Sequence, residues 1–97
     1  MDFKLFVVPE AEIEISEAIV YYESKQEGLG SIFLQYLDGY LYTLVKGRVF
    51  FEIKRKPAFR ELPLKKFPFI IIYEVVRNTI IVYSVFNTHQ DPNKKTK

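Results

Sequence analysis

The chain contains no cysteine and a single histidine among its 97 residues. The absence of cysteine excludes a disulfide framework, thiolate zinc ligation and a cysteine nucleophile. One histidine excludes a metal site built from several histidines. The longest apolar runs, such as residues 80–86, fall far short of the about 18 residues that a membrane-spanning helix needs. We therefore expect no metal, no cofactor and no membrane partner.

Composition and length predict a folded protein of one domain. Apolar residues make up 48% of the chain and charged residues 27%, a balance typical of globular rather than disordered proteins. We expect a single domain over residues 1–92, followed by a flexible basic tail over residues 93–97. Asp2 and the lack of a long apolar segment after it predict that no secretory signal is present. A cytoplasmic location is the resulting expectation.

The net charge of +2 conceals a sharp division along the chain. Residues 1–45 carry two basic and eight acidic side chains, whereas residues 46–97 carry twelve basic and four acidic ones. The halves therefore have net charges of −6 and +8. Such asymmetry points to a polyanion or an acidic partner. A basic hairpin solvated beside acidic helices would give the same pattern, and both interpretations stay open.

Apolar periodicity predicts the order of the elements. A β-branched and aromatic run over 3–8 predicts a strand, and helical spacing follows over 9–25 and from about 29 to 46. Strands are then expected over 49–54, 68–76 and 79–86, with a tight turn at Arg77–Asn78 in which asparagine tolerates positive φ. This is an α+β fold of order β-α-α-β-β-β. Its sheet is mainly antiparallel, with a two-helix hairpin packed on one face.

The two longest predicted strands are apolar at nearly every position, as in strands buried on both faces. Two helices can cover only one face, so the other face is expected to present apolar side chains. A partner chain, a second copy of this chain or its own folded-back tail would cover them, and a partner is the favoured interpretation. Gly39 lies off the apolar stripe of the second helix and should cost helix stability relative to alanine. Close approach of another chain is one explanation for it.

Taken together, these segments resemble the RelE/ParE superfamily of toxins from bacterial type II toxin–antitoxin systems. The resemblance extends from Phe3 to about Pro92 and depends on the order and spacing of several segments. In the helices these segments are Pro9-Glu10-Ala11-Glu12-Ile13, Ala18-Ile19-Val20-Tyr21-Tyr22 and Gly28-Leu29-Gly30-Ser31-Ile32-Phe33-Leu34. In the C-terminal half they are Phe59-Arg60-Glu61-Leu62-Pro63-Leu64, Phe67-Pro68-Phe69-Ile70-Ile71-Ile72-Tyr73-Glu74-Val75 and Ile81-Val82-Tyr83-Ser84-Val85-Phe86.

The resemblance implies a small cytoplasmic toxin, associated with plasmid stabilisation and silenced in a hetero-oligomer with a cognate antitoxin. RelE-like members cut messenger RNA on the ribosome, whereas ParE-like members bind DNA gyrase and do not cleave RNA. Whether this chain is an enzyme therefore stays open between an endoribonuclease and a gyrase inhibitor. A non-toxic module that binds protein or nucleic acid through the same fold is the alternative.

Metal-independent RNA cleavage needs a base, an acid and cations around the phosphorane. The candidate catalytic residues are Arg60 for phosphate stabilisation, Lys65 for charge neutralisation and His89 as an acid. The candidate contacts to nucleic acid or another target are Lys54, Arg55, Lys56, Lys66, Tyr73 and Arg77. Solvated loop cations, an inert tail histidine and a packed Tyr73 are the competing interpretations.

One departure from the family pattern weakens the nuclease interpretation. Family members often end the last strand with a histidine, followed two or three residues later by a basic residue. Asn87 and Gln90 occupy those positions here, and His89 lies beyond them in a polar segment. The phenylalanines of Phe67-Pro68-Phe69 also replace a usual polar run and favour a ParE-like protein, while the lysine-rich loop before them favours RNA.

Overall fold

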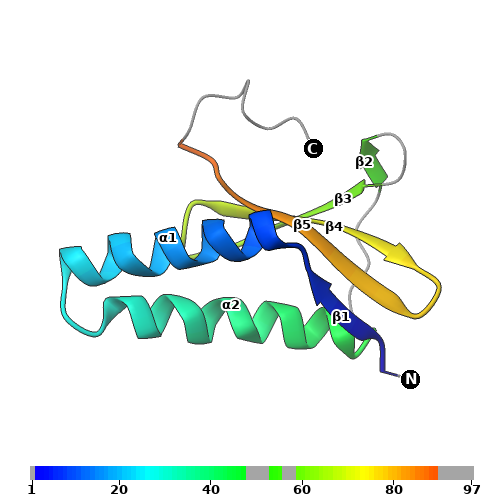
Figure 1. Cartoon of the computed structure of the whole chain (residues 1–97), viewed down its shortest axis with the longest axis horizontal. Helices are drawn as coiled ribbons and strands as arrows, with labels where there is room; N and C mark the ends of the chain where they lie inside the picture. The colour runs from blue at the N-terminus through cyan, green and yellow to red at the C-terminus, as the bar shows by residue number, and fades with distance from the viewer. Residues whose placement is uncertain (1, 48–52, 56–58, 90–97) are drawn as a thin grey trace.

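The computed structural model describes residues 2–47, 53–55 and 59–89, and they form two helices beside a five-stranded sheet (Figure 1). The elements are β1 (Lys4–Val7), α1 (Pro9–Lys25), α2 (Leu29–Val45), β2 (Ile53–Arg55), β3 (Phe59–Pro63), β4 (Phe69–Val76) and β5 (Thr79–Asn87). The predicted α+β class and the helix hairpin are confirmed. The expected strand over 49–54 is described only from Ile53, and the basic tail over 93–97 lies outside the described residues.

The two helices begin and end where the sequence predicts. Pro9 starts α1 at a position where its missing N–H costs nothing, with Glu10 and Glu12 in the first turn. Gly28 has a φ of +87° and turns the chain directly into α2, which ends before Gly47 at a φ of +70°. Both glycines adopt the left-handed region that other residues avoid. The helix hairpin is therefore determined by residues close to each helix end.

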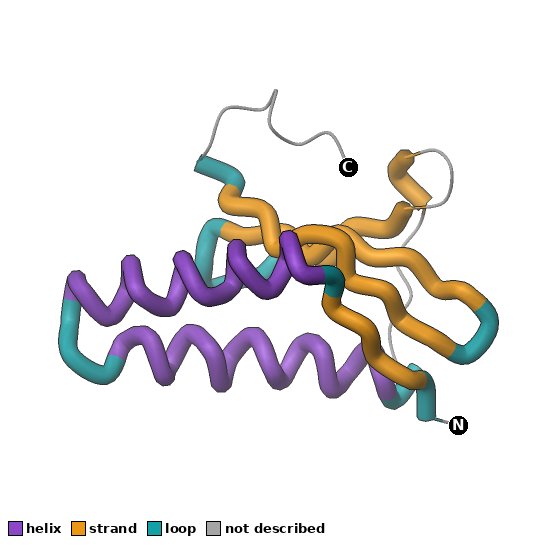
Figure 2. The backbone as a smooth tube through the Cα atoms, viewed as in Figure 1, coloured by secondary structure: helices purple, strands orange, loops and turns teal. Residues whose placement is uncertain are grey.

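The sheet has the order β1-β5-β4-β3-β2, with β1 parallel to β5 and the other pairs antiparallel. Figure 2 shows the strands in orange beside the two purple helices. Strand β3 is a correction to the predicted element order, because residues 59–63 were expected to lie in a connecting segment. They pair with β4 in a register that joins Arg60 to Tyr73 and Pro63 to Ile70. A proline is tolerated at the end of a strand, so Pro63 does not prevent this pairing.

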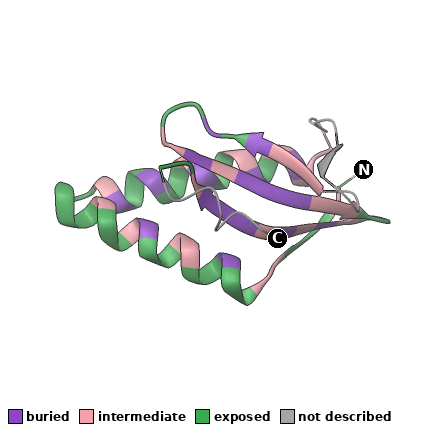
Figure 3. Cartoon of the chain, turned by 90° about the horizontal axis from the view of Figure 1, so that it is seen from above, coloured by how far each residue is buried: buried purple, intermediate pink, exposed green. Residues whose placement is uncertain are grey.

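The core lies between the helix hairpin and the sheet. Phe33 and Leu37 of α2 are fully buried against Ile71 of β4 and Val82 of β5. The registers of β4 and β5 shift between Ile72 and Tyr73, which indicates a β-bulge at that point. The shift lets Val82 and Val85, three residues apart, both join the core. Figure 3 shows buried residues along the strands, while much of the helical surface in that view is exposed.

The turn between β4 and β5 differs in one detail from the sequence prediction. Arg77, and not Asn78, has the positive φ, at +56°. This is an unfavoured conformation for a residue with a β-carbon, because Cβ then approaches backbone oxygen. The hairpin register, with Val76 opposite Thr79, leaves only two residues to close the turn and so imposes this geometry.

The prediction that the sheet exposes a large apolar face is wrong for its central strands. On the face opposite the helices, alternation places Ile72 and Phe86, which are only 1% and 5% exposed. The exposed apolar side chains lie instead mainly on the outer sides of the helices, where Ile13, Val20 and Ile32 are all more than half exposed. Within the described residues, no helix is long and apolar enough to cross a membrane.

Candidate functional site

The predicted cationic residues do not gather at one place in the structure. Lys65 and Lys66 are exposed in the loop between β3 and β4, and His89 is exposed just after β5 at the same end of the sheet. These two segments are joined there, since the Thr88 amide donates to the Pro68 carbonyl over 2.8 Å. His89 donates its own amide to the Asn87 side-chain oxygen over 2.8 Å. This end therefore unites two of the three predicted catalytic residues.

Arg60 and Arg77 lie elsewhere on the sheet. Arg60 is half-buried near the start of β3, whereas Lys65 lies in the loop that follows the end of β3 at Pro63. Arg77 is exposed in the turn at the opposite end of β4. Lys54 and Arg55 lie on β2, where Arg55 is opposite Phe59 in the edge pair, and Lys56 lies outside the described residues. The predicted cations are thus distributed along the sheet.

Tyr73 does not fit the role of a target contact. Its side chain is completely buried in the core, on the same face of β4 as Ile71. A base or a protein target could reach the ring only if the core opened. The prediction that Tyr73 contacts a target is contradicted by this burial, and the competing interpretation of a packed tyrosine describes its position.

Two tyrosines that the sequence analysis did not select hold the lysine loop. Tyr36 and Tyr40 are one turn apart on α2, and their hydroxyl oxygens are 3.0 Å from each other. The Lys65 amide donates to the Tyr40 hydroxyl over 3.2 Å and the Lys66 amide donates to the Tyr36 hydroxyl over 3.1 Å. The spacing of the pair, i and i+4, is the feature of the sequence that could have identified it.

The environment shifts the two phenols in opposite directions. The hydrogen bond from Tyr40 and the amides of the loop lower the pKa of Tyr36, because they stabilise its ionised oxygen. Desolvation raises the pKa of Tyr40, and its hydrogen bond to Tyr36 raises that pKa further. Either hydroxyl can donate in the hydrogen bond between them. The phenol that does not donate within the pair keeps its proton for an outside acceptor.

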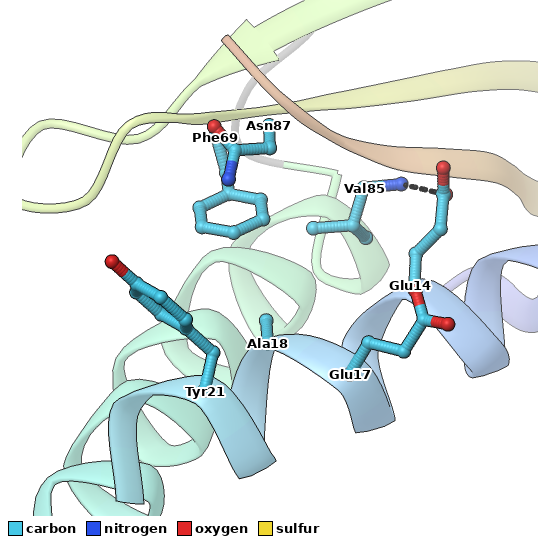
Figure 4. Close-up of a pocket in the computed structure, with 7 residues that line it drawn as sticks. All are labelled: Glu14, Glu17, Ala18, Tyr21, Phe69, Val85 and Asn87. Atoms are coloured by element: carbon cyan, nitrogen blue, oxygen red, sulfur yellow. Dashed lines mark hydrogen bonds between the residues drawn. The ribbon is translucent and has the colours of Figure 1, made fainter. Parts of the chain in front are cut away.

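An acidic hollow of about 190 Å³ lies between α1 and the sheet at the same end (Figure 4). Glu14, Glu17 and Tyr21 of α1 line one side, and Phe69 and Asn87 line the other. The two carboxylates favour a cationic or hydrogen-bond-donating group over an anion. In the described part of the chain, no group of three acidic, histidine or cysteine side chains could hold a metal ion.

Glu14 also has a structural role in this hollow. One of its carboxylate oxygens accepts hydrogen bonds from the Ser84 hydroxyl at 2.8 Å and from the Val85 amide at 2.9 Å. Strand β1 pairs with β5 only as far as Val82, so the edge of β5 lacks a partner strand beyond that residue. Glu14 supplies the missing acceptor there, a role that only the tertiary structure reveals.

Another polar pair lies on the face of the sheet opposite the helices. The Tyr83 hydroxyl donates to a Glu74 carboxylate oxygen over 2.8 Å, and the Tyr83 ring packs edge-on against Phe59 at 5.0 Å between centroids. The carboxylate raises the pKa of Tyr83, since it stabilises the protonated phenol. Glu74 is therefore engaged by a neighbour rather than aimed at a substrate.

Comparison with known proteins finds a solved structure with the same fold. A chain of the solved structure "Chromosomal ParDE TA system from P. aeruginosa" superposes with a TM-score of 0.74 and 16% sequence identity. The alignment covers 90% of this chain and 97% of that chain. No family model matches the sequence. No curated protein matches it either. At this level of identity the comparison establishes the architecture, which is the one that the resemblance predicted.

Proposed function

We propose that this chain is the toxin of a type II toxin–antitoxin system and is neutralised by a cognate antitoxin. The observation that carries the proposal is the shared fold, since nearly the whole of this chain superposes on nearly the whole of a chain from a ParDE system. The two chains superpose over nearly all of each, and such a match supports a similar kind of protein better than a match confined to one shared core would. The cytoplasm, where its targets are found, is the location that goes with this function.

Within that function, we infer that the target is a protein, DNA gyrase, and that the chain does not cleave RNA. Cleavage of RNA needs a base, an acid and phosphate-binding cations within a few ångströms of one phosphodiester. Arg60 lies near the start of β3, roughly 10 Å along the strand from its end at Pro63, whereas Lys65 lies in the loop beyond that end. Asn87 occupies the strand-end position of the usual histidine. A dispersed set of cations suits an extended protein contact better than a single reacting phosphate.

The contacts that we propose for the target are the exposed cations Lys65, Lys66 and Arg77, together with Lys54 and Arg55 on β2. Lys56 belongs to the same set from its place in the sequence. Arg60 is the residue on which the two mechanisms differ most clearly. In an RNase it would stabilise the phosphorane, whereas in a gyrase inhibitor it would only add to the positive charge of the sheet.

The test is induced expression of the full chain from a tightly repressed promoter. We expect growth arrest together with loss of plasmid supercoiling, measured on gels that resolve topoisomers, while primer extension on abundant messages shows no new cleavage sites. Translation-dependent mRNA cuts that disappear in Arg60→Ala would refute the gyrase assignment and establish the nuclease. Expression that is harmless, with the folded protein accumulating, would contradict toxicity and favour the non-toxic binding module.

A further inference from the structure

A groove of about 730 Å³ lies between α2 and the end of β3. Tyr36, Gly39 and Thr43 form its helical side, and residues from Leu62 to Lys65 form the other side. Leu62 and Leu64 are more than nine-tenths buried, so the floor of the groove is apolar and firmly packed. The helical side extends over nine residues from Gln35 to Thr43, a rise of about 12 Å.

Gly39 is the residue that the rest of the chain does not explain. It lies in the middle of α2, where glycine is less stable than alanine, and a β-carbon built there meets no atom within 4 Å. Its backbone is in ordinary helical conformation, since the described glycines with positive φ are Gly28 and Gly47. Neither packing nor backbone geometry within the described chain therefore requires a glycine here. Departures from local preference of this kind are expected at binding surfaces.

The polar end of the groove is suited to an anion. Tyr36 and Tyr40 share one hydroxyl proton between them, and each accepts a loop amide, which leaves one phenolic proton to donate. Among the described residues, no side chain or carbonyl oxygen accepts that proton. Lys65 lines the same end of the groove and is exposed. A carboxylate placed there would receive a phenolic hydrogen bond and a lysine charge together.

We propose that this groove binds an acidic amphipathic helix of a partner protein, packed across Gly39 with a carboxylate at the Tyr36–Tyr40 pair and Lys65. An α-helix presents apolar side chains at i, i+3, i+4 and i+7, and about two turns match the length of the groove. The missing side chain at position 39 allows the backbone of the partner helix to approach α2 closely. The occupant is held by apolar contact with the exposed lining at Gly39 and Pro63, above the packed floor, and is oriented by charge at one end.

Other occupants fit less well. A nucleic acid would need cations along the whole groove, whereas its floor is apolar and Lys65 lies at one end. The last residues of the chain itself, Asn93-Lys94-Lys95-Thr96-Lys97, carry three lysines and would be repelled by Lys65. A second copy offering its acidic α1 would form a head-to-tail contact that does not close on itself, which is rare among soluble assemblies.

The proposal deepens the proposed function by locating a surface for a neutralising partner, and it rests on that function only for the partner's biological role. The measurement therefore uses binding by the purified full-length chain and no growth readout. The probe is a fluorescein-labelled designed helix of about four turns, with leucine and alanine on one face and glutamate on the other. A second probe has lysine in place of every glutamate. Binding is followed by fluorescence anisotropy at low and at moderate salt.

We expect the glutamate helix to bind at least about tenfold more tightly than the lysine helix, a difference of about 1.4 kcal/mol. Gly39→Leu fills the groove and should weaken binding at least about tenfold, whereas Ser31→Leu adds the same side chain on the exposed first turn of α2 and should not. Lys65→Glu should weaken binding and remove much of its salt dependence. Lys4→Glu makes the same charge change on exposed β1, at the other edge of the sheet, and should have little effect.

Several results would overturn the proposal. Equal binding by Gly39→Leu and Ser31→Leu would show that the helix binds elsewhere, and equal binding of the two probes would show that charge does not select it. Self-association of the chain that is lost in Gly39→Leu, measured by analytical ultracentrifugation, would identify a second copy as the occupant. Toxicity in cells bears on none of these outcomes, so failure of the groove and failure of the proposed function are separable.

Discussion

Two glycines on the same helix should respond to alanine with opposite signs. At Gly30 a new β-carbon would lie 2.7 Å from the Ile19 carbonyl oxygen and 3.1 Å from its Cγ2 methyl, where α2 packs against α1. Backbone oxygen cannot move aside as a flexible side chain can. Forced overpacking of this kind costs about 1–3 kcal/mol. At Gly39 the same β-carbon has open space around it.

We therefore expect Gly39→Ala to raise the free energy of unfolding by up to about 1 kcal/mol, the difference in helix propensity. Gly30→Ala should lower it by about 2 kcal/mol. For a domain of this size, about 1 kcal/mol corresponds to roughly 4–8 °C in Tm. The predicted shifts are thus an increase of several degrees and a decrease of about 10 °C.

Thermal unfolding followed by circular dichroism, with urea titrations at 25 °C, measures both shifts. Each variant is the control for the other, because the chemical change is identical and only the surroundings differ. Destabilisation by Gly39→Ala would mean that the groove beside it is already filled by the chain. Stabilisation by Gly30→Ala would mean that the helices do not approach each other as closely as described. Either result would refute the reasoning.

Three further predictions concern single side chains. The amides of Gly28 and Gly30 donate to the Glu23 carboxylate and lower its pKa. The stability that Glu23 contributes should therefore be complete above the pKa of an unfolded glutamate and be lost as pH falls through the lower folded pKa. Urea midpoints of Glu23→Gln, measured across acidic pH, should lack this loss. Arg77→Gly should raise the free energy of unfolding by about 0.5 kcal/mol, since about 1 kcal/mol of relieved strain exceeds about 0.5 kcal/mol of added unfolded-state entropy, and a lower urea midpoint would contradict the positive φ. Glu14→Ala should cost about 1–3 kcal/mol by leaving two donors on β5 without an acceptor, and Glu14→Gln should cost less; equal midpoints for wild type and Glu14→Ala would show that the hydrogen bonds contribute nothing.

The helices could be predicted from sequence because their determinants are local. The apolar spacing around Phe33 and Leu37, the proline at position 9 and the glycines at 28 and 47 each act within a few residues of their own position. The two long strands were equally clear from their apolar runs. Strand β3 was missed because the segment 59–63 is short and polar at two positions, and pairing with β4 is what holds it as a strand.

The burial of the outer sheet face could not be predicted because sequence alternation indicates which residues share a face and not what covers that face. The β-bulge near Tyr73 belongs to the same category, since it arises from a register between two strands. Similarly, Tyr36 and Tyr40 become hydrogen-bond acceptors for the loop amides only when the loop carrying Lys65 folds back onto α2. Contacts between distant segments leave no pattern in the neighbouring sequence, because many different residue pairs can meet at the same distance and orientation.

The amino-acid sequence by itself determined the class of fold, the helix hairpin, the absence of thiol chemistry and the segregation of acidic from basic residues. The tertiary structure alone decided that the cations are spread along the sheet, that Tyr73 is enclosed in the core, and that a groove opens beside Gly39. The physical reason is that composition and periodicity act through neighbouring residues, whereas a binding surface is formed by side chains from elements that are far apart in the chain and meet only when the core is packed.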